Sequence, residues 1–227
     1  MKYFSELQEG LQDPNIFKAF FLAGGPGSGK SYVVRKTTGG MGLKVVNSDD
    51  AFEKLLKDAG LSLKMPASEE EPRDVVRKRA KDLTKRKQAN YLEGRIGLIL
   101  DGTGKDYDKI AKQSAELKQL GYETHMIFVN TSLDTALQRN AKRSRSVPES
   151  IVVQSWKDVQ SNIGKFSQHF RQNFVVVDNN DADEDVFNTV FKQIKSLVKK
   201  KVTNPLAKKW VYNQMQLRGI TKPPKGF

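Results

Sequence analysis

The chain has 227 residues and a formal net charge of +13, and it contains no cysteine. This length suffices for one domain with a substantial core, while the lack of cysteine excludes a disulfide framework and a thiolate zinc site. No apolar run approaches the ~20 residues that a membrane-spanning helix needs, and the opening MKYFSELQEG lacks the apolar segment of a secretory signal, so we expect a soluble, cytoplasmic protein.

Strand and helix patterns alternate along the chain, which predicts an α/β fold with a mostly parallel sheet. Five apolar segments are typical of strands: residues 17–23, 43–47, 96–100, 124–130 and 174–178. Apolar spacing and end signals predict helices over residues 30–36, 49–59, 73–93, 107–120, 132–140, 148–170, 183–200 and 205–217. Residues 61–72 between two of these helices are expected to form a loop.

The first predicted strand leads directly into a glycine-rich segment, and residues 18–31 read KAFFLAGGPGSGKS. This segment fills the pattern G-x-x-x-x-G-K-[ST] of a phosphate-binding loop. Glycine lets the backbone approach a ligand closely, so that loop N–H groups and the helix N-terminus form an anion site. Lys30 supplies a charge for the β- and γ-phosphates, and Ser31 supplies a hydroxyl for Mg²⁺. The sequence therefore predicts an ATP and Mg²⁺ site built on Gly24, Gly25, Pro26, Gly27, Ser28, Gly29, Lys30 and Ser31. The fold class expected with this loop is a P-loop NTPase three-layer sandwich with a mostly parallel five-stranded sheet, a helical lid and a basic C-terminal extension.

Acidic residues follow the second and third predicted strands. Asp49 and Asp50 lie in the segment NSDD, and Asp101 opens the segment DGTG. Ligands of open α/β sheets bind beyond the C-terminal strand ends, so these carboxylates should lie near the γ-phosphate. A carboxylate there can accept the proton of an attacking hydroxyl or hold magnesium through water, and we assign Asp50, Asp101 and Thr103 to the acceptor side. The alternative is structural, with Ser48 or Asp49 capping the next helix and Asp101 capping a tight turn.

Three arginines lie close together in the segment QRNAKRSRSVPES. Arg139 and Arg143 are four residues apart and should share a helix face, and Arg145 follows near a proline. Guanidinium groups suit a clamp on a transferring phosphoryl group. We therefore expect a lid in which Arg139 and Arg145 bind the nucleotide and Arg143 is catalytic, with an exposed basic turn as the alternative. Residues 178–180, after the last strand, are expected to border the adenine.

The order GGPGSGKS, NSDD, DGT and RNAKRSRSVP resembles the 5′-hydroxyl polynucleotide kinases of bacteriophages and, more distantly, the zeta-toxin kinases, over roughly residues 17–170. The resemblance implies an ATP-dependent kinase with a hydroxyl acceptor, in which Lys30 and Ser31 bind phosphates and magnesium. It also implies that Asp49 is the general base and that Arg143 is the lid arginine nearest the transferring group. Residues 1–200 would then form the P-loop kinase domain and residues 201–227 a basic C-terminal extension, in a host cytoplasm if the chain is phage-encoded.

Two departures from the bacteriophage enzymes leave the acceptor open. Phe52 stands where those enzymes carry an acceptor-contacting arginine, and a basic tail replaces the phosphatase domain that they append. Zeta toxins phosphorylate a nucleotide sugar, and the acidic acceptor residue expected there has a candidate in Glu53. The acceptor can therefore differ even where the chemistry is the same.

The positive charge is concentrated in two segments. Residues 73–95 carry nine basic and three acidic side chains, and residues 199–227 carry eight basic and no acidic ones. Localised charge of this kind indicates a polyanionic partner, although a solvated helix face and a solubilising tail are the alternative. The leading interpretation is a kinase of the 5′-hydroxyl of a polynucleotide, with both basic segments bound to nucleic acid.

Two other functions remain open at this point. The first is a zeta-toxin-like kinase of a nucleotide sugar or another small metabolite, for which the positive charge is incidental. The second is a nucleotide-binding module that docks on another protein through an apolar stripe of Leu206, Trp210 and Leu217, unless that stripe packs on the chain's own core. The sequence predicts no particular oligomeric state.

Overall fold

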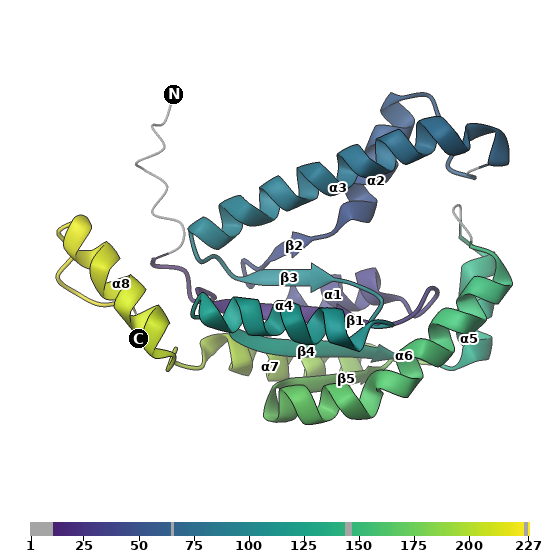
Figure 1. Ribbon diagram of the computed structural model, residues 1–227. Helices are drawn as coiled ribbons and strands as arrows, with labels where there is room; N and C mark the ends of the chain where they lie inside the picture. Colours follow the sequence, from purple (N-terminus) through teal and green to yellow (C-terminus); the bar gives the residue numbers. More distant parts are fainter. Residues whose placement is uncertain (1–10, 65, 144–146, 225–226) are drawn as a thin grey trace.

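The structure is a computed structural model that describes residues 11–64, 66–143, 147–224 and 227. Its strands form one five-stranded sheet in the order β2-β3-β1-β4-β5, and each neighbouring pair is parallel (Figure 1). The strands are β1 Lys18–Ala23, β2 Lys44–Val46, β3 Leu98–Asp101, β4 Glu123–Asn130 and β5 Phe174–Asp178. The predicted α/β fold with a parallel five-stranded sheet is thereby confirmed.

Helices cover both faces of this sheet and give the molecule three layers (Figure 1). The α-helices are α1 Lys30–Thr38, α2 Ser48–Asp58, α3 Glu70–Glu93, α4 Tyr107–Gln119, α5 Leu133–Ala141, α6 Glu149–Phe170, α7 Glu184–Lys199 and α8 Pro205–Leu217. α4 and α6 pack on one face, and α1 and α7 pack on the other. Among the described residues, every helix is too short or too polar to cross a lipid bilayer.

The central strand β1 is buried along its whole length, as a strand with helices on both faces must be. Successive side chains of a strand point to opposite faces, so β1 contributes to two separate apolar clusters. Phe21 packs on the side of α4 and α6, whereas Phe20 and Leu22 pack on the side of α1 and α7. Both faces therefore hold β1 rigidly, and the glycine-rich loop at its C-terminal end is attached to the most buried strand of the sheet.

The long helix α3 begins at Glu70, three residues earlier than predicted, within the segment expected to be a loop. Two acidic residues, Glu70 and Glu71, occupy its first turn, where the positive end of the helix dipole favours them. Pro72 is tolerated at this position because the first turn of a helix needs no backbone donor there. α3 packs on α2 beside the β2 edge of the sheet (Figure 1).

A third apolar cluster joins α2 to α3. Phe52 is 2% exposed within this cluster, together with Leu56 and Ala80. The guanidinium carbon of Arg77 lies 4.3 Å from the centroid of the Phe52 ring. The residue at the position of the acceptor-contacting arginine of the bacteriophage enzymes is thus a packing residue in this chain.

The C-terminal helix α8 packs against the start of β1. Val202, Ala207 and Val211 are buried in the same cluster as Phe17, whose ring makes an edge contact with Trp210 at a centroid distance of 5.5 Å. Leu206 and Leu217 are exposed instead. Of the three residues of the predicted apolar stripe, Trp210 therefore packs on the chain's own core, whereas Leu206 and Leu217 face solvent. The boundary between a kinase domain of residues 1–200 and an extension of residues 201–227 stays a prediction.

Candidate active site

The loop between β1 and α1 requires glycine at three positions. Gly24, Gly27 and Gly29 have positive φ values of 152°, 80° and 80°, a region that other residues rarely adopt. A Cβ atom at Gly27 would collide with the backbone carbonyl of Ala136, and one at Gly29 would collide with the side-chain amide of Asn179. Ala136 and Asn179 therefore pack against the outer side of the loop, and the inner side is left for a ligand.

Side chains from later in the sequence hold this loop in place. Asn179 donates its side-chain amide to the carbonyl of Ser28 at 2.7 Å, and the hydroxyl of Thr131 donates to the same oxygen at 3.3 Å. Arg139 donates to the backbone carbonyls of Asn179 and Asn180, at 2.7 and 2.8 Å. The segment after β5 thus links an arginine of α5 to the glycine-rich loop.

A cavity of about 610 Å³ opens at the C-terminal ends of β1, β2 and β3. Most of the site residues predicted from the sequence line it: Gly25, Pro26, Gly27, Gly29, Lys30, Ser31, Asp49, Asp50, Asp101, Thr103, Arg139 and Arg143. Gly24 and Ser28 belong to the same loop but are buried and do not line the cavity, and Arg145 lies outside the described residues. The strand ends have therefore brought together motifs that are more than 100 residues apart.

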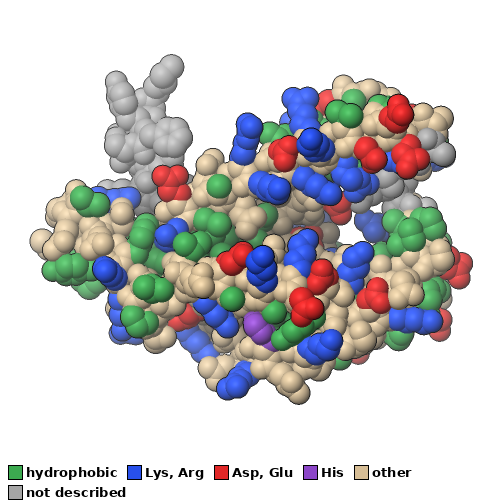
Figure 2. Space-filling view, in the orientation of Figure 1, with side chains coloured by type: hydrophobic (Ala, Val, Ile, Leu, Met, Phe, Trp, Pro, Cys, Tyr) green, Lys and Arg blue, Asp and Glu red, His purple; other side chains and the backbone are tan. Residues whose placement is uncertain are grey.

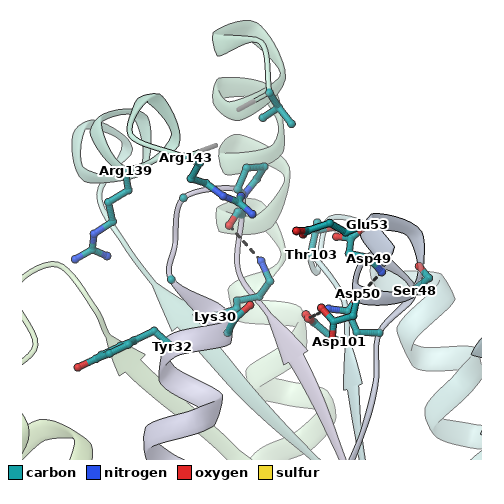
Figure 3. Close-up of a pocket in the computed structure, with 18 residues that line it drawn as sticks. Lys30, Tyr32, Ser48, Asp49, Asp50, Glu53, Asp101, Thr103, Arg139 and Arg143 are labelled. Atoms are coloured by element: carbon teal, nitrogen blue, oxygen red, sulfur yellow. Dashed lines mark hydrogen bonds between the residues drawn. The ribbon is translucent and has the colours of Figure 1, made fainter. Parts of the chain in front are cut away.

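Positive and negative side chains face each other across this cavity. Figure 3 shows Lys30 and Arg143 on one side and the carboxylates of Asp49, Asp50, Glu53 and Asp101 on the other. The Lys30 ammonium donates to the carbonyls of Gly24 and Gly25, at 2.6 and 3.3 Å. The glycine-rich loop therefore holds the Lys30 ammonium at the edge of the cavity.

Burial shifts two pKa values in opposite senses. Burial lowers the pKa of Lys30, and Arg143 acts in the same direction while Asp101 and Asp49 oppose it. Burial raises the pKa of Asp101, with Asp49 and Asp50 adding to the rise and Lys30 opposing it. Each charge is therefore costly in this position, and each favours the ionised form of the other.

Asn47 is a site residue that the sequence interpretation missed. Its side-chain oxygen accepts a hydrogen bond from the backbone N–H of Asp49 at 2.7 Å and so caps α2. Its amide donates to Asp101 at 2.8 Å. The structural alternative, in which Ser48 or Asp49 caps this helix, does not hold, because Asn47 at the preceding position performs that role. An asparagine at the end of a strand and just before a helix was the signal available.

The two described lid arginines point in different directions. Arg139 lies in the last turn of α5 and turns towards the segment after β5, whereas Arg143 follows the helix and turns towards Lys30 (Figure 3). Glu53 and Tyr32 also line the cavity, and neither was among the predicted site residues, although Glu53 was named as a candidate acceptor residue. Tyr32 follows Ser31 in the sequence and is exposed at the opposite side from the carboxylates.

The zeta toxin family model matches residues 6–190 of the chain. No curated protein matches it significantly. Among solved structures, a candidate kinase from Chloroflexus aurantiacus is similar, at a TM-score of 0.54 and 14% identity, over 80% of this chain and 98% of that one. The AvrRxo1-ORF1:-ORF2 structure with ATP is similar at a TM-score of 0.55 and 14% identity, over 86% of this chain and 70% of that one.

The similar solved structures show the fold. The family match decides between the two families that the sequence motifs resemble. The family match supports the zeta-toxin kinases, and neither it nor the solved structures support bacteriophage polynucleotide kinases specifically. The match spans the glycine-rich loop, the carboxylates after β2 and β3, and the arginines after β4. The chain belongs to the zeta toxin family and is an ATP-dependent P-loop kinase of that type.

Proposed function

We propose that this kinase transfers the γ-phosphoryl group of ATP to a hydroxyl of a small molecule, with nucleotide sugars as the first acceptors to test. The observation that carries the proposal is the row of carboxylates facing Lys30 and Arg143 across one cavity (Figure 3). Glu53 belongs to that row, one helical turn after Asp49, and is the candidate for the acidic acceptor residue of zeta toxins. A cavity of about 610 Å³ is of the size that suits small ligands.

The proposed reaction is a direct displacement at the γ-phosphorus. The acceptor oxygen forms a bond to phosphorus, the bond from phosphorus to the β–γ bridging oxygen breaks, and ADP leaves with that electron pair. Asp49 takes the proton of the attacking hydroxyl, which is the role of the carboxylate in kinases generally. Lys30 and Arg143 stabilise the negative charge on the transferring group, and they act more strongly because the site is partly buried.

Magnesium fits the residues at the phosphate end of the cavity. Ser31 offers a hydroxyl and Asp101 a carboxylate there, and the described residues contain no cluster of three His, Cys, Asp or Glu side chains able to hold a metal ion alone. This donor set suits Mg²⁺, which binds through one or two protein groups together with substrate phosphates and water. Ser31 and Asp101 would hold the ion, which supplies charge neutralisation for the β- and γ-phosphate oxygens.

The nucleotide base would lie at the side of Arg139 and Tyr32. Both residues line the cavity away from the carboxylates, and Arg139 is fixed by its two hydrogen bonds to the segment after β5. Arg145 is proposed as a further nucleotide contact from the lid. This arrangement leaves the side of Asp50 and Thr103, next to the magnesium ligand Asp101, for the acceptor.

A polynucleotide 5′-hydroxyl is the second candidate acceptor, and the surface of α3 favours it. Basic side chains follow one another along this helix (Figure 2): Lys78, Arg79, Lys81, Lys85, Arg86 and Lys87. All six residues are exposed, and within the described part of the chain none of them forms a salt bridge. Binding of nucleic acid through such a surface would weaken steeply with added salt.

An acceptor screen tests the proposal. The wild-type protein is incubated with γ-labelled ATP and either nucleotide sugars, small alcohols or a 5′-hydroxyl oligonucleotide, and the labelled product is identified by mass spectrometry. We expect label on a small molecule, lost in Asp49→Asn and retained in Asp58→Asn, a matched change on the far end of α2. Label on the oligonucleotide alone, reduced by charge removal on α3, would instead establish the second candidate.

A further inference from the structure

A second groove, of about 390 Å³, opens from the acceptor side of the catalytic cavity. The two spaces share four residues, which are Ser31, Asn47, Asp50 and Asp101. Because two of these residues carry the carboxylates proposed for the acceptor side, the groove begins where the reacting hydroxyl would lie. It is continuous with the site, and neither the proposed function nor the sequence motifs account for it.

One wall of the groove is a single face of α1. Ser31, Val34, Arg35 and Thr38 all line it, and their spacing of three and four residues puts them in one row on the helix. Seven residues of helix rise about 10 Å, so this wall extends about 10 Å from the hydroxyl of Ser31. The groove is therefore long enough for a ring or a short chain beyond the reacting hydroxyl.

The opposite wall is one face of β2 and its flanks. Leu43, Val45 and Asn47 alternate along the strand, so their side chains point to the same side. Val45 is 38% exposed, whereas Leu22 of β1, two strands away in the sheet, is a buried member of the groove lining. The wall stays open because β2 is the edge strand and α7 packs on the opposite flank of α1.

The chemistry of the groove changes along its length. Carboxylates and Asn47 lie at its inner end, apolar side chains line its middle, and Arg35 stands on its flank. The Arg35 guanidinium lies 5.6 Å from the centroid of the Tyr32 ring, and it forms no salt bridge within the described residues. Tyr32 itself does not line the groove, but Arg35 lines it and lacks an acidic partner among the described residues, which suits its guanidinium to an anionic group.

We propose that this groove binds the body of the acceptor and selects alcohols that carry an apolar ring or chain and an anionic group. The hydroxyl passes Asp50 into the catalytic cavity to meet Asp49, the apolar part lies against Val34, Leu43 and Val45, and the anionic group pairs with Arg35. The inference rests on the proposed transfer to a small alcohol. It adds to that proposal the chemical class of the acceptor and the residues that select it.

Equilibrium binding tests the groove without requiring catalysis. The probe is 8-anilinonaphthalene-1-sulfonate, an apolar ring system with one anionic group, measured by its fluorescence on the full chain. Val45→Trp should fill the groove and weaken probe binding about tenfold or more, a loss equivalent to one well-packed contact. Val176→Trp is the matched control, because Val176 is 44% exposed on β5, the other edge strand. Equal effects of the two tryptophan variants would overturn the proposal.

A second variant keeps the test decisive if Val45→Trp fails to fold. Arg35→Gln should weaken binding of the sulfonate probe several-fold, whereas Lys36→Gln, on the next residue of α1 and outside the groove, should leave it unchanged. Unchanged binding in Arg35→Gln would remove the anionic part of the proposal. Sedimentation that finds a dimer in the wild type and a monomer in Val45→Trp alone would overturn it in favour of a second copy on β2.

Kinase assays then separate this inference from the function on which it rests. The acceptors are 4-(hydroxymethyl)benzoate and benzyl alcohol, which differ only in the anionic group. We expect the benzoate to be the better acceptor, with its KM raised by Val45→Trp and by Arg35→Gln while the KM for ATP stays unchanged. Phosphorylation of other small alcohols with no effect of either variant would overturn the groove and leave the proposed function intact. Lack of label on every small alcohol, with probe binding still lost in Val45→Trp, would overturn the proposed function instead.

Discussion

Asn47 donates a hydrogen bond to Asp101 at 2.8 Å while its other side-chain atom caps the helix that carries Asp49. One residue therefore sets the position of the acid after β3 and of the acid after β2. The hydrogen bond to Asp101 favours the ionised carboxylate, against the burial that raises its pKa. Asn47 touches no reacting atom in this arrangement and is a positioning residue.

Replacement of Asn47 by aspartate separates its two roles. Asn47→Asp keeps an oxygen that can cap α2, but it places a second carboxylate against Asp101 and removes the amide donor. Like charge raises the pKa of Asp101 further, so the acid limb of the pH–rate profile should move to higher pH. We also expect kcat to fall at neutral pH, because Asp101 loses its amide donor and gains a like charge beside it. The measurement is kcat from pH 5 to 9.

Asn47→Ala is the control for stability. It removes the cap as well as the amide donor and should lower the free energy of unfolding by about 1 kcal/mol at every pH, whereas the loss in Asn47→Asp should disappear at low pH, where the paired carboxylates are protonated. If both variants lose the same stability and neither moves the acid limb, the hydrogen bond to Asp101 has no role in positioning.

Lys30 and Asp49 should differ in what their loss does to ATP binding. Asp49→Asn keeps the shape of the site and removes only the proton acceptor, so transfer should fall about 10²–10⁴-fold with ATP affinity nearly unchanged. Lys30→Ala removes a phosphate contact as well and should lower turnover by orders of magnitude and weaken ATP binding. Isothermal titration calorimetry with ATP, beside steady-state kinetics, distinguishes them. Equal loss of ATP affinity in both variants would contradict the assignment of Asp49 as the base.

The phosphate loop and the carboxylates after the strands could be predicted because their signals are local. The pattern around Lys30 specifies its own backbone shape, and Asp49 and Asp101 follow strands whose apolar residues mark where they end. Parallel strands then bring their C-terminal ends to one edge of the sheet, so the meeting of these residues follows from the fold class. Arg143 was found from its residue type, but the expectation that it shares a helix face with Arg139 was wrong, because α5 ends at Ala141.

Other parts of the site depend on contacts between distant segments. Hydrogen bonds from Arg139 to Asn179 and from Asn179 to Ser28 connect α5, the segment after β5 and the glycine-rich loop. No local sequence pattern indicates these contacts. The groove beside Val45 exists because β2 is an edge strand that α7 does not cover, which requires the strand order. The packing of Phe52 on α3 likewise needs the α2–α3 contact, which the sequence pattern alone does not specify.

His125 should make the stability of the fold depend on pH. Its ring stacks on Phe20 with centroids 4.6 Å apart, and among the described residues neither ring nitrogen has a hydrogen-bond partner. Burial, with the charges of Lys18 and Lys200, lowers the pKa of His125 to about 3. The unfolded chain takes up a proton below about pH 6.5 and the folded chain does not, so stability is lost as pH falls from 6.5 towards 3. The slope reaches at most about 1.4 kcal/mol per pH unit.

His125→Phe should remove this slope. Between pH 6.5 and 5 the wild type should lose roughly 2 kcal/mol of unfolding free energy that the variant retains, as measured by urea unfolding at each pH. The other histidine, His169, is partly exposed, and its replacement by glutamine should change the slope much less. A wild-type slope that persists in His125→Phe would show that other groups cause it.

Trp210 should stabilise the kinase core although it lies in the predicted C-terminal extension. Its ring makes an edge contact with Phe17, which is fully buried at the start of β1, and α8 buries Ala207 and Val211 beside it. Trp210→Ala should therefore lower the free energy of unfolding by about 3 kcal/mol, in a single cooperative urea transition. Tyr212→Ala on the exposed side of the same helix should change it by no more than about 0.5 kcal/mol. A separate early unfolding transition for α8, with the main transition unchanged by Trp210→Ala, would instead show that residues 201–227 are an independent unit. If α8 belongs to the core, loss of the Trp210 contact must also destabilise β1, because Phe17 at the start of β1 packs against it.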